Sequence, residues 1–132
     1  MLLSQKTVLV IDDNVGLHQS LAMMTGRTFP ITFIAATTLA EAQRRFQEHI
    51  DTIDAVLVDG CIESRECDTL PLLRMITTSH FHGPVIAISG DRHNRRLMVR
   101  HGANGACDKH EVRNKLEEML LAPPPKRHIP RR

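Results

Sequence analysis

The sequence predicts an α/β protein built on a five-stranded parallel sheet that helices cover on both faces. Five short apolar runs alternate with segments whose apolar residues recur at helical spacing. Several of these runs stop abruptly on an acidic or hydroxyl residue, and residues that form turns or cap helices follow them. Such an alternation of strands and helices is typical of a doubly wound, three-layer α/β/α fold.

The five predicted strands are short and aliphatic. The third lies within DAVLVDG, residues 54–60, where an apolar run between two acids indicates a strand buried on both faces of the sheet. The other predicted strands are residues 7–11, 31–35, 85–89 and 103–107. Because the chain contains four Phe and no Trp or Tyr, we expect an aliphatic core.

A helical repeat of apolar residues marks the segments between and after the strands. These residues are Leu17, Leu21 and Met24 in the first helix, Leu39, Ala42 and Phe46 in the second, and Val112, Leu116, Met119 and Leu120 in the last. The candidate N-caps of the first four helices are Asn14, Thr37 or Thr38, Asp68, and Asp91. Pro71 would lie in the first turn of the third helix, which should end near Ser79. Gly102 should end the fourth helix.

Length and composition indicate one folded domain, residues 1–121, followed by a tail. Apolar residues make up 42% and charged residues 24% of the chain, as in ordinary globular proteins. The sequence has neither a signal peptide nor a long apolar segment, so we expect a cytoplasmic protein that does not enter the membrane. Three cysteines without an export signal predict reduced thiols rather than disulfides.

The formal net charge of +2 comes from the C-terminal end of the chain. Four of the 17 Lys and Arg residues lie in the last seven positions, and the remaining 13 are set against 15 Asp and Glu. Residues 122–132 are rich in proline and basic residues, and we expect them to be disordered. Direct nucleic-acid binding is not expected, because the basic tail lacks interleaved aromatic residues and a recognition helix.

Polar groups of three kinds gather at the ends of the predicted strands. Asp12 and Asp13 follow the first strand, Asp59 ends the third, Ser89 ends the fourth and Lys109 follows the fifth. Parallel strands place their carboxyl ends at one edge of the sheet, where open α/β sheets bind ligands. Carboxylates held close together raise one another's pKa, and a hard cation such as Mg²⁺ relieves their repulsion. Each residue alone would also fit a plain role as a cap, a turn residue or a surface lysine.

The sequence resembles the chemotaxis-type receiver domains of response regulators in two-component (phosphorelay) signalling. The resemblance covers residues 5–121 and rests on the ordered motifs VLVIDDN, VLVDG, ISG and GANGACDK. It implies a flavodoxin-like fold with strand order 2-1-3-4-5. It also implies that Asp59 takes a phosphoryl group from a phosphohistidine on a sensor histidine kinase or a histidine phosphotransfer protein. Ser89 and Lys109 would stabilise the transferred group, and Ser89 would act as the switch.

The resemblance further implies a metal site and a mode of signalling. Asp13, Asp59 and the backbone carbonyl of Cys61 would hold Mg²⁺, with Mn²⁺ as a substitute, and Asp12 would act through a metal-bound water. The chain would work as a stand-alone phospho-acceptor and not as an enzyme, with only self-phosphorylation and slow loss of the phosphoryl group. Phosphorylation would switch its interaction with an unidentified downstream protein.

The sequence departs from the receiver pattern at four positions. Ile62 and Glu63 replace the methionine and proline usual after the acceptor, Ala106 replaces an aromatic switch residue, and His110 replaces a common cis-proline. We expect a trans peptide before His110, because a cis bond before a non-proline residue costs about 3 kcal/mol. These departures favour an alternative, a pseudo-receiver that keeps the fold and works as an interaction module without phosphorylation.

Four arginines share one face of the predicted fourth helix. They are Arg92, Arg95, Arg96 and Arg100, at positions i, i+3, i+4 and i+8. A charged helix face is ordinarily solvated. The alternative is an output surface for an acidic partner, because receiver domains commonly signal through this helix and its neighbours.

Overall fold

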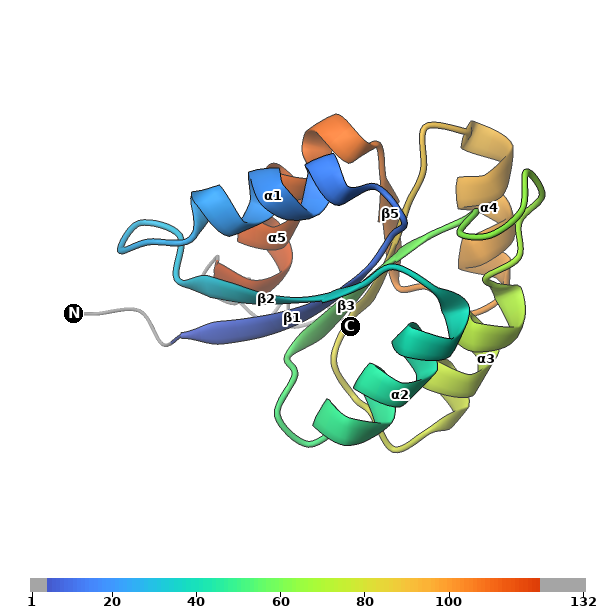
Figure 1. Cartoon of the computed structure of the whole chain (residues 1–132), viewed down its shortest axis with the longest axis horizontal. Coiled ribbons are helices and arrows are strands. Elements are labelled where there is room, and N and C mark those ends of the chain that lie inside the picture. The colour runs from blue at the N-terminus through green and yellow to red at the C-terminus, as the bar shows by residue number, and fades with distance from the viewer. Residues whose placement is uncertain (1–4, 122–132) are drawn as a thin grey trace, which may run out of the picture.

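The computed structural model describes residues 5–121, and the tail predicted for residues 122–132 lies outside the described residues. A five-stranded, all-parallel sheet of order β2-β1-β3-β4-β5 forms the central layer, which confirms the predicted fold and strand order (Figure 1). Its strands are β1 (Lys6–Ile11), β2 (Ile31–Ala36), β3 (Ala55–Asp59), β4 (Val85–Ile88) and β5 (Gly105–Cys107). The last strand is shorter than predicted and begins at residue 105 instead of 103.

Helices cover both faces of the sheet. They are α1 (Val15–Met24), α2 (Leu39–His49), α3 (Leu70–Thr78), α4 (Arg92–Arg100) and α5 (Val112–Leu116). A 3-10 turn over Lys109–Glu111 leads into α5, which continues as a π-helical segment over Glu117–Leu121. Figure 1 shows α1 and α5 on one face, and α2, α3 and α4 on the other. Within residues 5–121, no helix has the length and apolar character needed to cross a membrane.

The sheet separates two apolar cores. On one face Phe46 of α2, Leu73 of α3 and Met98 of α4 are buried against the strands. On the other face Leu21 of α1 and Leu116 of α5 take the same role. All five residues of β3 are buried, as predicted for a strand covered on both faces. Each large apolar side chain buried in this way stabilises the fold by about 1.5–3 kcal/mol.

Three predicted N-caps are confirmed. A side-chain oxygen of Asn14, Thr38 and Asp91 accepts a hydrogen bond from a backbone N–H in the first turn of its helix, at 3.2, 3.1 and 2.8 Å respectively. Pro71 lies in the first turn of α3, and that helix ends at Thr78, next to the predicted end. The caps of α1 and α4 each lie three residues after the end of a strand, so they fix where the chain turns at the polar edge of the sheet.

The predicted cap of α3 is wrong. Thr69 occupies the N-cap position and makes no side-chain capping bond, while Asp68 lies one residue earlier. The Asp68 carboxylate instead accepts hydrogen bonds from the backbone N–H groups of Ile62 and Glu63, both at 2.8 Å. This arrangement uses both carboxylate oxygens, whereas a cap uses one. Asp68 therefore closes the loop between β3 and α3.

The end of α4 requires a glycine. Gly102 has a φ of +115°, in the region that side chains with a Cβ rarely adopt, and it follows the last turn of the helix as predicted. A Cβ at this position would also lie 2.9 Å from Oγ1 and Cγ2 of Thr77 in α3. The backbone conformation and the close neighbour both exclude larger residues.

Replacing Gly102 with Ala should lower the free energy of unfolding by about 1–3 kcal/mol, because the alanine Cβ strains the backbone and overlaps Thr77. Urea unfolding of the two proteins measures the difference. Gly26→Ala is the matched control, because a Cβ at Gly26 would meet no atom within 4 Å. Equal losses in the two variants would contradict this account of the helix end.

Candidate functional site

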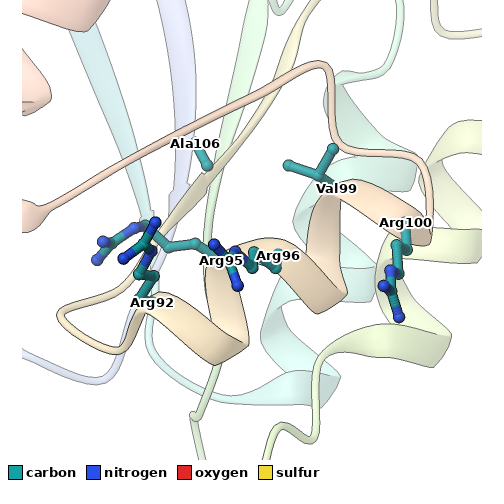
Figure 2. Close-up of a pocket in the computed structure, with 6 residues that line it drawn as sticks. All are labelled: Arg92, Arg95, Arg96, Val99, Arg100 and Ala106. Carbon is teal, nitrogen blue, oxygen red and sulfur yellow. The ribbon is translucent and has the colours of Figure 1, made fainter.

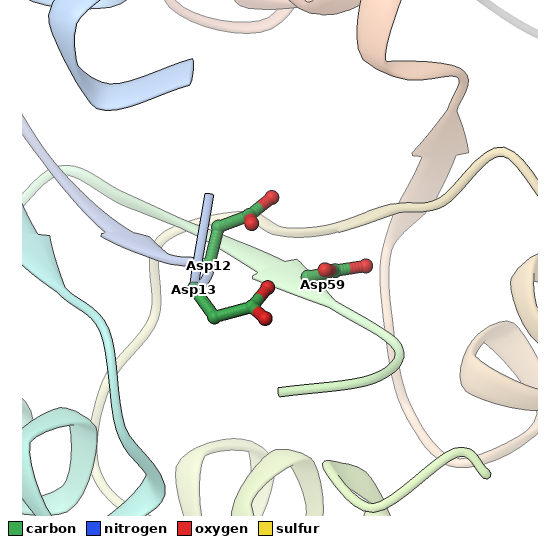
Figure 3. Close-up of side chains that lie close together, drawn as sticks. All are labelled: Asp12, Asp13 and Asp59. Atoms are coloured by element: carbon green, nitrogen blue, oxygen red, sulfur yellow. The ribbon is translucent and has the colours of Figure 1, made fainter. Parts of the chain in front are cut away.

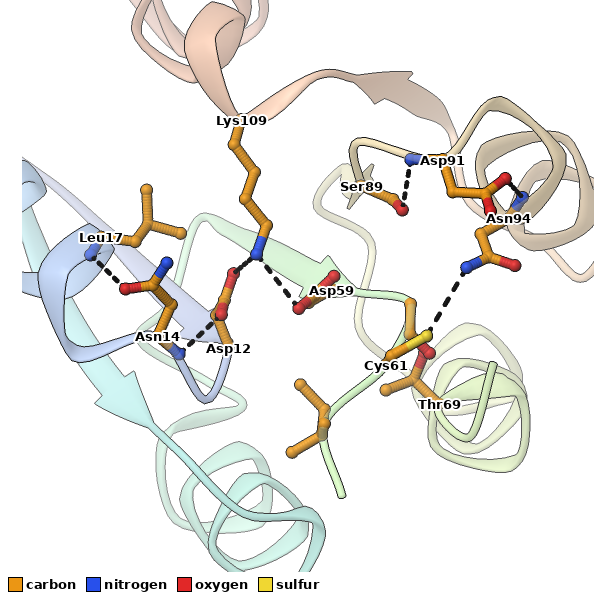
Figure 4. Close-up of polar contacts among 12 residues, drawn as sticks. Asp12, Asn14, Leu17, Asp59, Cys61, Thr69, Ser89, Asp91, Asn94 and Lys109 are labelled. Carbon is orange, nitrogen blue, oxygen red and sulfur yellow. Dashed lines mark hydrogen bonds and ion pairs between the residues drawn. The ribbon is translucent and has the colours of Figure 1, made fainter. Parts of the chain in front are cut away.

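The register of the sheet brings the predicted polar groups to one edge. β1 and β3 are neighbours, and Ile11 pairs with Val58. Asp12 follows Ile11 and Asp59 follows Val58, so the two acids lie side by side. β4 and β5 continue the sheet beyond β3, and Ser89 and Lys109 follow their carboxyl ends. Figure 4 shows Asp12, Asp59, Ser89 and Lys109 around this edge.

Three carboxylates cluster at the ends of β1 and β3. One oxygen each of Asp12, Asp13 and Asp59 lies within 4.8 Å of the other two (Figure 3). Asp12 is fully buried and Asp59 is 6% exposed, whereas Asp13 is exposed to solvent. The site therefore has two buried acids and one exposed acid.

Lys109 reaches across the edge to the two buried acids. Its Nζ lies 3.2 Å from Oδ2 of Asp12 and 3.3 Å from Oδ2 of Asp59, to which it donates a hydrogen bond (Figure 4). Burial alone would lower the pKa of Lys109, but the charges of Asp59 and Asp12 raise it above its ordinary value. The lysine is therefore protonated at neutral pH and partly balances the carboxylates.

The pKa of Asp59 is raised to about 6. Burial is the largest cause, and repulsion from Asp12 adds to it, while Lys109 and the hydrogen bond from the Gly60 N–H act in the opposite direction. In the absence of a cation, ionised Asp59 thus costs the folded state free energy at neutral pH. Raised pKa values of this kind gather at functional sites.

The three acids fit a small divalent cation. Asp12 Oδ2 is fully buried and makes no hydrogen bond of good geometry in the described part of the chain, so its only partner is the Lys109 ammonium. Oxygens in the octahedral shell of Mg²⁺ lie at most about 4.2 Å apart, close to the spread of the three carboxylates. Cys61, whose carbonyl is the fourth predicted ligand, lies two residues after Asp59 in the loop that leaves β3.

Ser89 lies at the same edge but does not bond to Asp59. It is 5% exposed, and its Oγ accepts a hydrogen bond from the backbone N–H of Asp91 at 3.1 Å. Its carbonyl oxygen accepts one from Nη1 of Arg95 at 2.7 Å. The structure thus holds Ser89 from the side of α4, a contact that sequence analysis missed because the donor is six residues away on another element.

The loop between β3 and α3 is fixed by contacts that sequence analysis also missed. The buried Thr69 hydroxyl donates to the Gly60 carbonyl at 3.1 Å, and the Asp68 N–H donates to the same oxygen. Asn94 of α4 donates to Cys61 Sγ at 3.5 Å. The only sequence signal for these contacts is Asp68, which the pattern instead predicts to be the cap of the third helix.

One departure from the receiver pattern, His110, has the backbone geometry that the sequence predicts. Residues 5–121 contain no cis peptide, so the bond before His110 is trans as predicted.

Burial raises the pKa of Cys61 and Cys67, and raises that of Cys107 to about 11. All three thiols are therefore protonated at neutral pH, which disfavours a role for them as nucleophiles.

Removing the charge of Asp59 should stabilise the metal-free protein at pH 7. Because the folded-state pKa of about 6 exceeds the ordinary value of 3.8, the folded state loses stability as pH rises between these values. Asp59→Asn should therefore raise the free energy of unfolding by up to about 3 kcal/mol at pH 7, and the gain should vanish near pH 4. Urea unfolding in chelator at the two pH values measures it, and a gain that does not change with pH would contradict the assignment.

Comparisons with known proteins support the fold. The sequence matches no protein-family model and no curated protein. A receiver domain from Clostridium thermocellum has 22% identity and a TM-score of 0.71, covering 88% of this chain and 94% of the other. A receiver domain from Bacteroides fragilis has 23% identity and a TM-score of 0.70, with 89% and 95% covered.

A third similar structure contains a receiver protein in a complex. It is the CheX–CheY–BeF3–Mg²⁺ complex from Borrelia burgdorferi, with 22% identity and a TM-score of 0.67, covering 89% of this chain and 90% of the other. All three structures are of response regulators or their receiver domains, and each matches most of this chain. The expected resemblance is therefore confirmed in three dimensions: the chain has the fold of a response-regulator receiver domain.

Proposed function

We propose that this protein is a phospho-acceptor response regulator of two-component signalling, with Asp59 as the acceptor. The observation that carries the proposal is the cluster of Asp12, Asp13 and Asp59 with the ammonium of Lys109, at the ligand-binding edge of a receiver fold. The donor is a phosphohistidine on a sensor kinase or a phosphotransfer protein. The protein then accepts a phosphoryl group and is not an enzyme acting on a separate substrate.

In the transfer, a carboxylate oxygen of Asp59 attacks the phosphorus atom as the P–N bond to the donor imidazole breaks. The imidazole leaves with the bonding electron pair, and the product is an acyl phosphate on Asp59. Such a reaction depends on positioning and on neutralising charge more than on covalent assistance. The Nζ of Lys109, 3.3 Å from Asp59 Oδ2, is placed to balance charge on the phosphoryl oxygens.

The acidic residues would hold Mg²⁺ beside the acceptor. Asp13, Asp59 and the carbonyl of Cys61 would bind it directly, and Asp12 would act through a water. When bound, Mg²⁺ neutralises negative charge on the donor and acceptor oxygens. The similar complex from Borrelia burgdorferi contains Mg²⁺ together with BeF3, which supports this choice of metal.

Ser89 would carry the signal away from Asp59. Its hydroxyl, now bonded to the Asp91 N–H, would turn to donate to a phosphoryl oxygen, because an ionised acceptor makes the stronger hydrogen bond. The loop between β4 and α4 would move with it. This movement would change the surface that a downstream protein contacts.

Mg²⁺ should raise the midpoint of thermal unfolding, because it binds the folded carboxylate cluster and not the unfolded chain. Asp13→Asn should remove most of this increase while leaving both buried acids in place. Asp51→Asn is the matched control, because Asp51 is an exposed acid outside the cluster that pairs with His80. A Mg²⁺ effect that is equal in the two variants would contradict the assigned ligands.

Incubation with acetyl phosphate and Mg²⁺ should add one phosphoryl group, seen by intact-mass analysis. Asp59→Asn should show no gain, and chelation should abolish it. Lys109→Gln should lower the rate by about a hundredfold, in line with the loss of one charged transition-state contact, whereas Lys115→Gln should not change it. If neither acetyl phosphate nor a phosphohistidine protein modifies Asp59, the pseudo-receiver alternative replaces this proposal.

A further inference from the structure

The three central strands of the sheet, β1, β3 and β4, end in the same way. The first residue after each strand has a backbone carbonyl that a side chain from the following helix, or from the cap of that helix, contacts. The pairs are His18 and Asp12 at 2.6 Å, Thr69 and Gly60 at 3.1 Å, and Arg95 and Ser89 at 2.7 Å. These carbonyls lie where the pairing of the strands ends, so each needs a donor from outside the sheet.

His18 and Arg95 hold equivalent positions in their helices. Each is the fourth residue of its helix, since α1 begins at Val15 and α4 at Arg92, and each follows its carbonyl by six residues. Figure 2 shows Arg95 beside the other arginines of α4 that line a pocket of about 450 Å³. Those others are exposed, whereas Arg95 is half-buried and turns back to the Ser89 carbonyl. The fourth helical residue therefore faces the end of the preceding strand in both helices.

The contact with Asp12 is the only hydrogen bond of the His18 ring within residues 5–121. Its Nδ1 is buried and has no partner there. Because a carbonyl only accepts, Nε2 carries the ring proton and donates it to the Asp12 oxygen. No other group in residues 5–121 donates to this oxygen. An unpartnered buried nitrogen costs stability, so the polar contribution of His18 is the donor at Nε2.

The bond from His18 fixes the start of Asp13. The Asp12 carbonyl and the Asp13 N–H belong to one planar peptide group, so a bond to the oxygen also sets how the chain enters Asp13. On the other side, the Asn14 N–H donates to Oδ1 of Asp12 at 2.8 Å. The Asp13 carboxylate is exposed and accepts no hydrogen bond within residues 5–121. Its place beside Asp12 and Asp59 therefore depends on the backbone (Figure 3).

We propose that His18 is a positioning residue of the cation site, and that its hydrogen bond to the Asp12 carbonyl holds the Asp13 carboxylate beside Asp59. The inference rests on the proposed function, in which Asp13 binds Mg²⁺ directly. His18 does not touch the cation and acts only through Asp13. The loss of a residue that orients a metal ligand in this way typically weakens metal binding by about ten- to a hundredfold.

A titration with Mn²⁺, followed by the electron paramagnetic resonance of the free ion, tests this role at a temperature where circular dichroism shows each variant folded. His18→Leu removes the donor and should weaken Mn²⁺ binding by about tenfold. His18→Gln should bind within about twofold of the wild type, because its amide N–H can replace that of Nε2. His101→Leu is the matched control and should bind like the wild type, since Nδ1 of His101 contacts the Leu97 carbonyl within α4.

A second background tests whether His18 acts through Asp13. In Asp13→Asn, the further change His18→Leu should alter the Mn²⁺ affinity by less than about twofold, because the ligand that His18 positions is already lost. A merely structural role would lower the stability of the fold in both backgrounds and leave the Mn²⁺ affinity of the folded protein unchanged. An equal tenfold loss in both backgrounds would overturn the proposal.

Three results in the wild-type background would also overturn it. The first is equal Mn²⁺ affinity in His18→Leu and the wild type. The second is an equal loss in His18→Gln and His18→Leu, which would assign the effect to the packing of the ring. The third is an equal loss in His101→Leu, which would show that the effect is not specific to this end of β1.

Nuclear magnetic resonance of the metal-free protein separates this inference from the proposed function. The amide nitrogen of Asp13 belongs to the same peptide group as the Asp12 carbonyl, so its resonance reports the bond from His18. His18→Gln and His18→Leu both lack the imidazole ring, so a difference between their Asp13 resonances reports the hydrogen bond, and equal resonances would refute it. If the wild type binds no Mn²⁺, the cation site of the proposed function fails, and this comparison alone decides whether His18 holds the Asp13 peptide.

Discussion

The repulsion among three carboxylates at one edge of the sheet is the constraint on which the rest of the site depends. The pairing of β1 with β3 forces Asp12 and Asp59 into adjacent positions, and the fold buries both. One ammonium, that of Lys109, lies within 3.3 Å of each, so the cluster keeps excess negative charge when all three acids are ionised. A bound cation would offset this excess negative charge.

Most of the hydrogen bonds that fix the surrounding loops come from other groups, although Oδ1 of Asp12 accepts one from the Asn14 N–H at 2.8 Å. Thr69 and the Asp68 N–H hold the Gly60 carbonyl, and the Asp68 side chain closes the loop after β3. Ser89 is held by Asp91 and Arg95. These bonds leave the excess negative charge of the carboxylate cluster in place. A rigid frame around this charge would suit the phosphoryl transfer proposed above.

Sequence patterns predicted the elements and the acidic edge because both depend on local information. Apolar runs and caps such as Asn14 are read within one element, and parallel pairing alone brings strand ends together. The role of Asp68 depends on which backbone donors the folded loop presents. The shorter length of β5 depends on Asn104, whose side chain and N–H both form hydrogen bonds with the backbone of Val85. The bond from Arg95 to Ser89 was equally out of reach, because it joins a side chain to a carbonyl that carries no sequence signal.

Position 106 on β5 holds alanine, and Arg95 of α4 donates a hydrogen bond to the Ser89 carbonyl. A ring that moves into a buried space can report the position of a neighbouring hydroxyl, but alanine has no such freedom. A guanidinium can instead report through the hydrogen bond it donates, and that bond is sensitive to any anion that competes for it. The hydrogen bond from Arg95 thus depends on charge, whereas the contact of a ring would depend on packing. Competition of an anion for this guanidinium should consequently weaken with added salt, whereas a packing contact would not change.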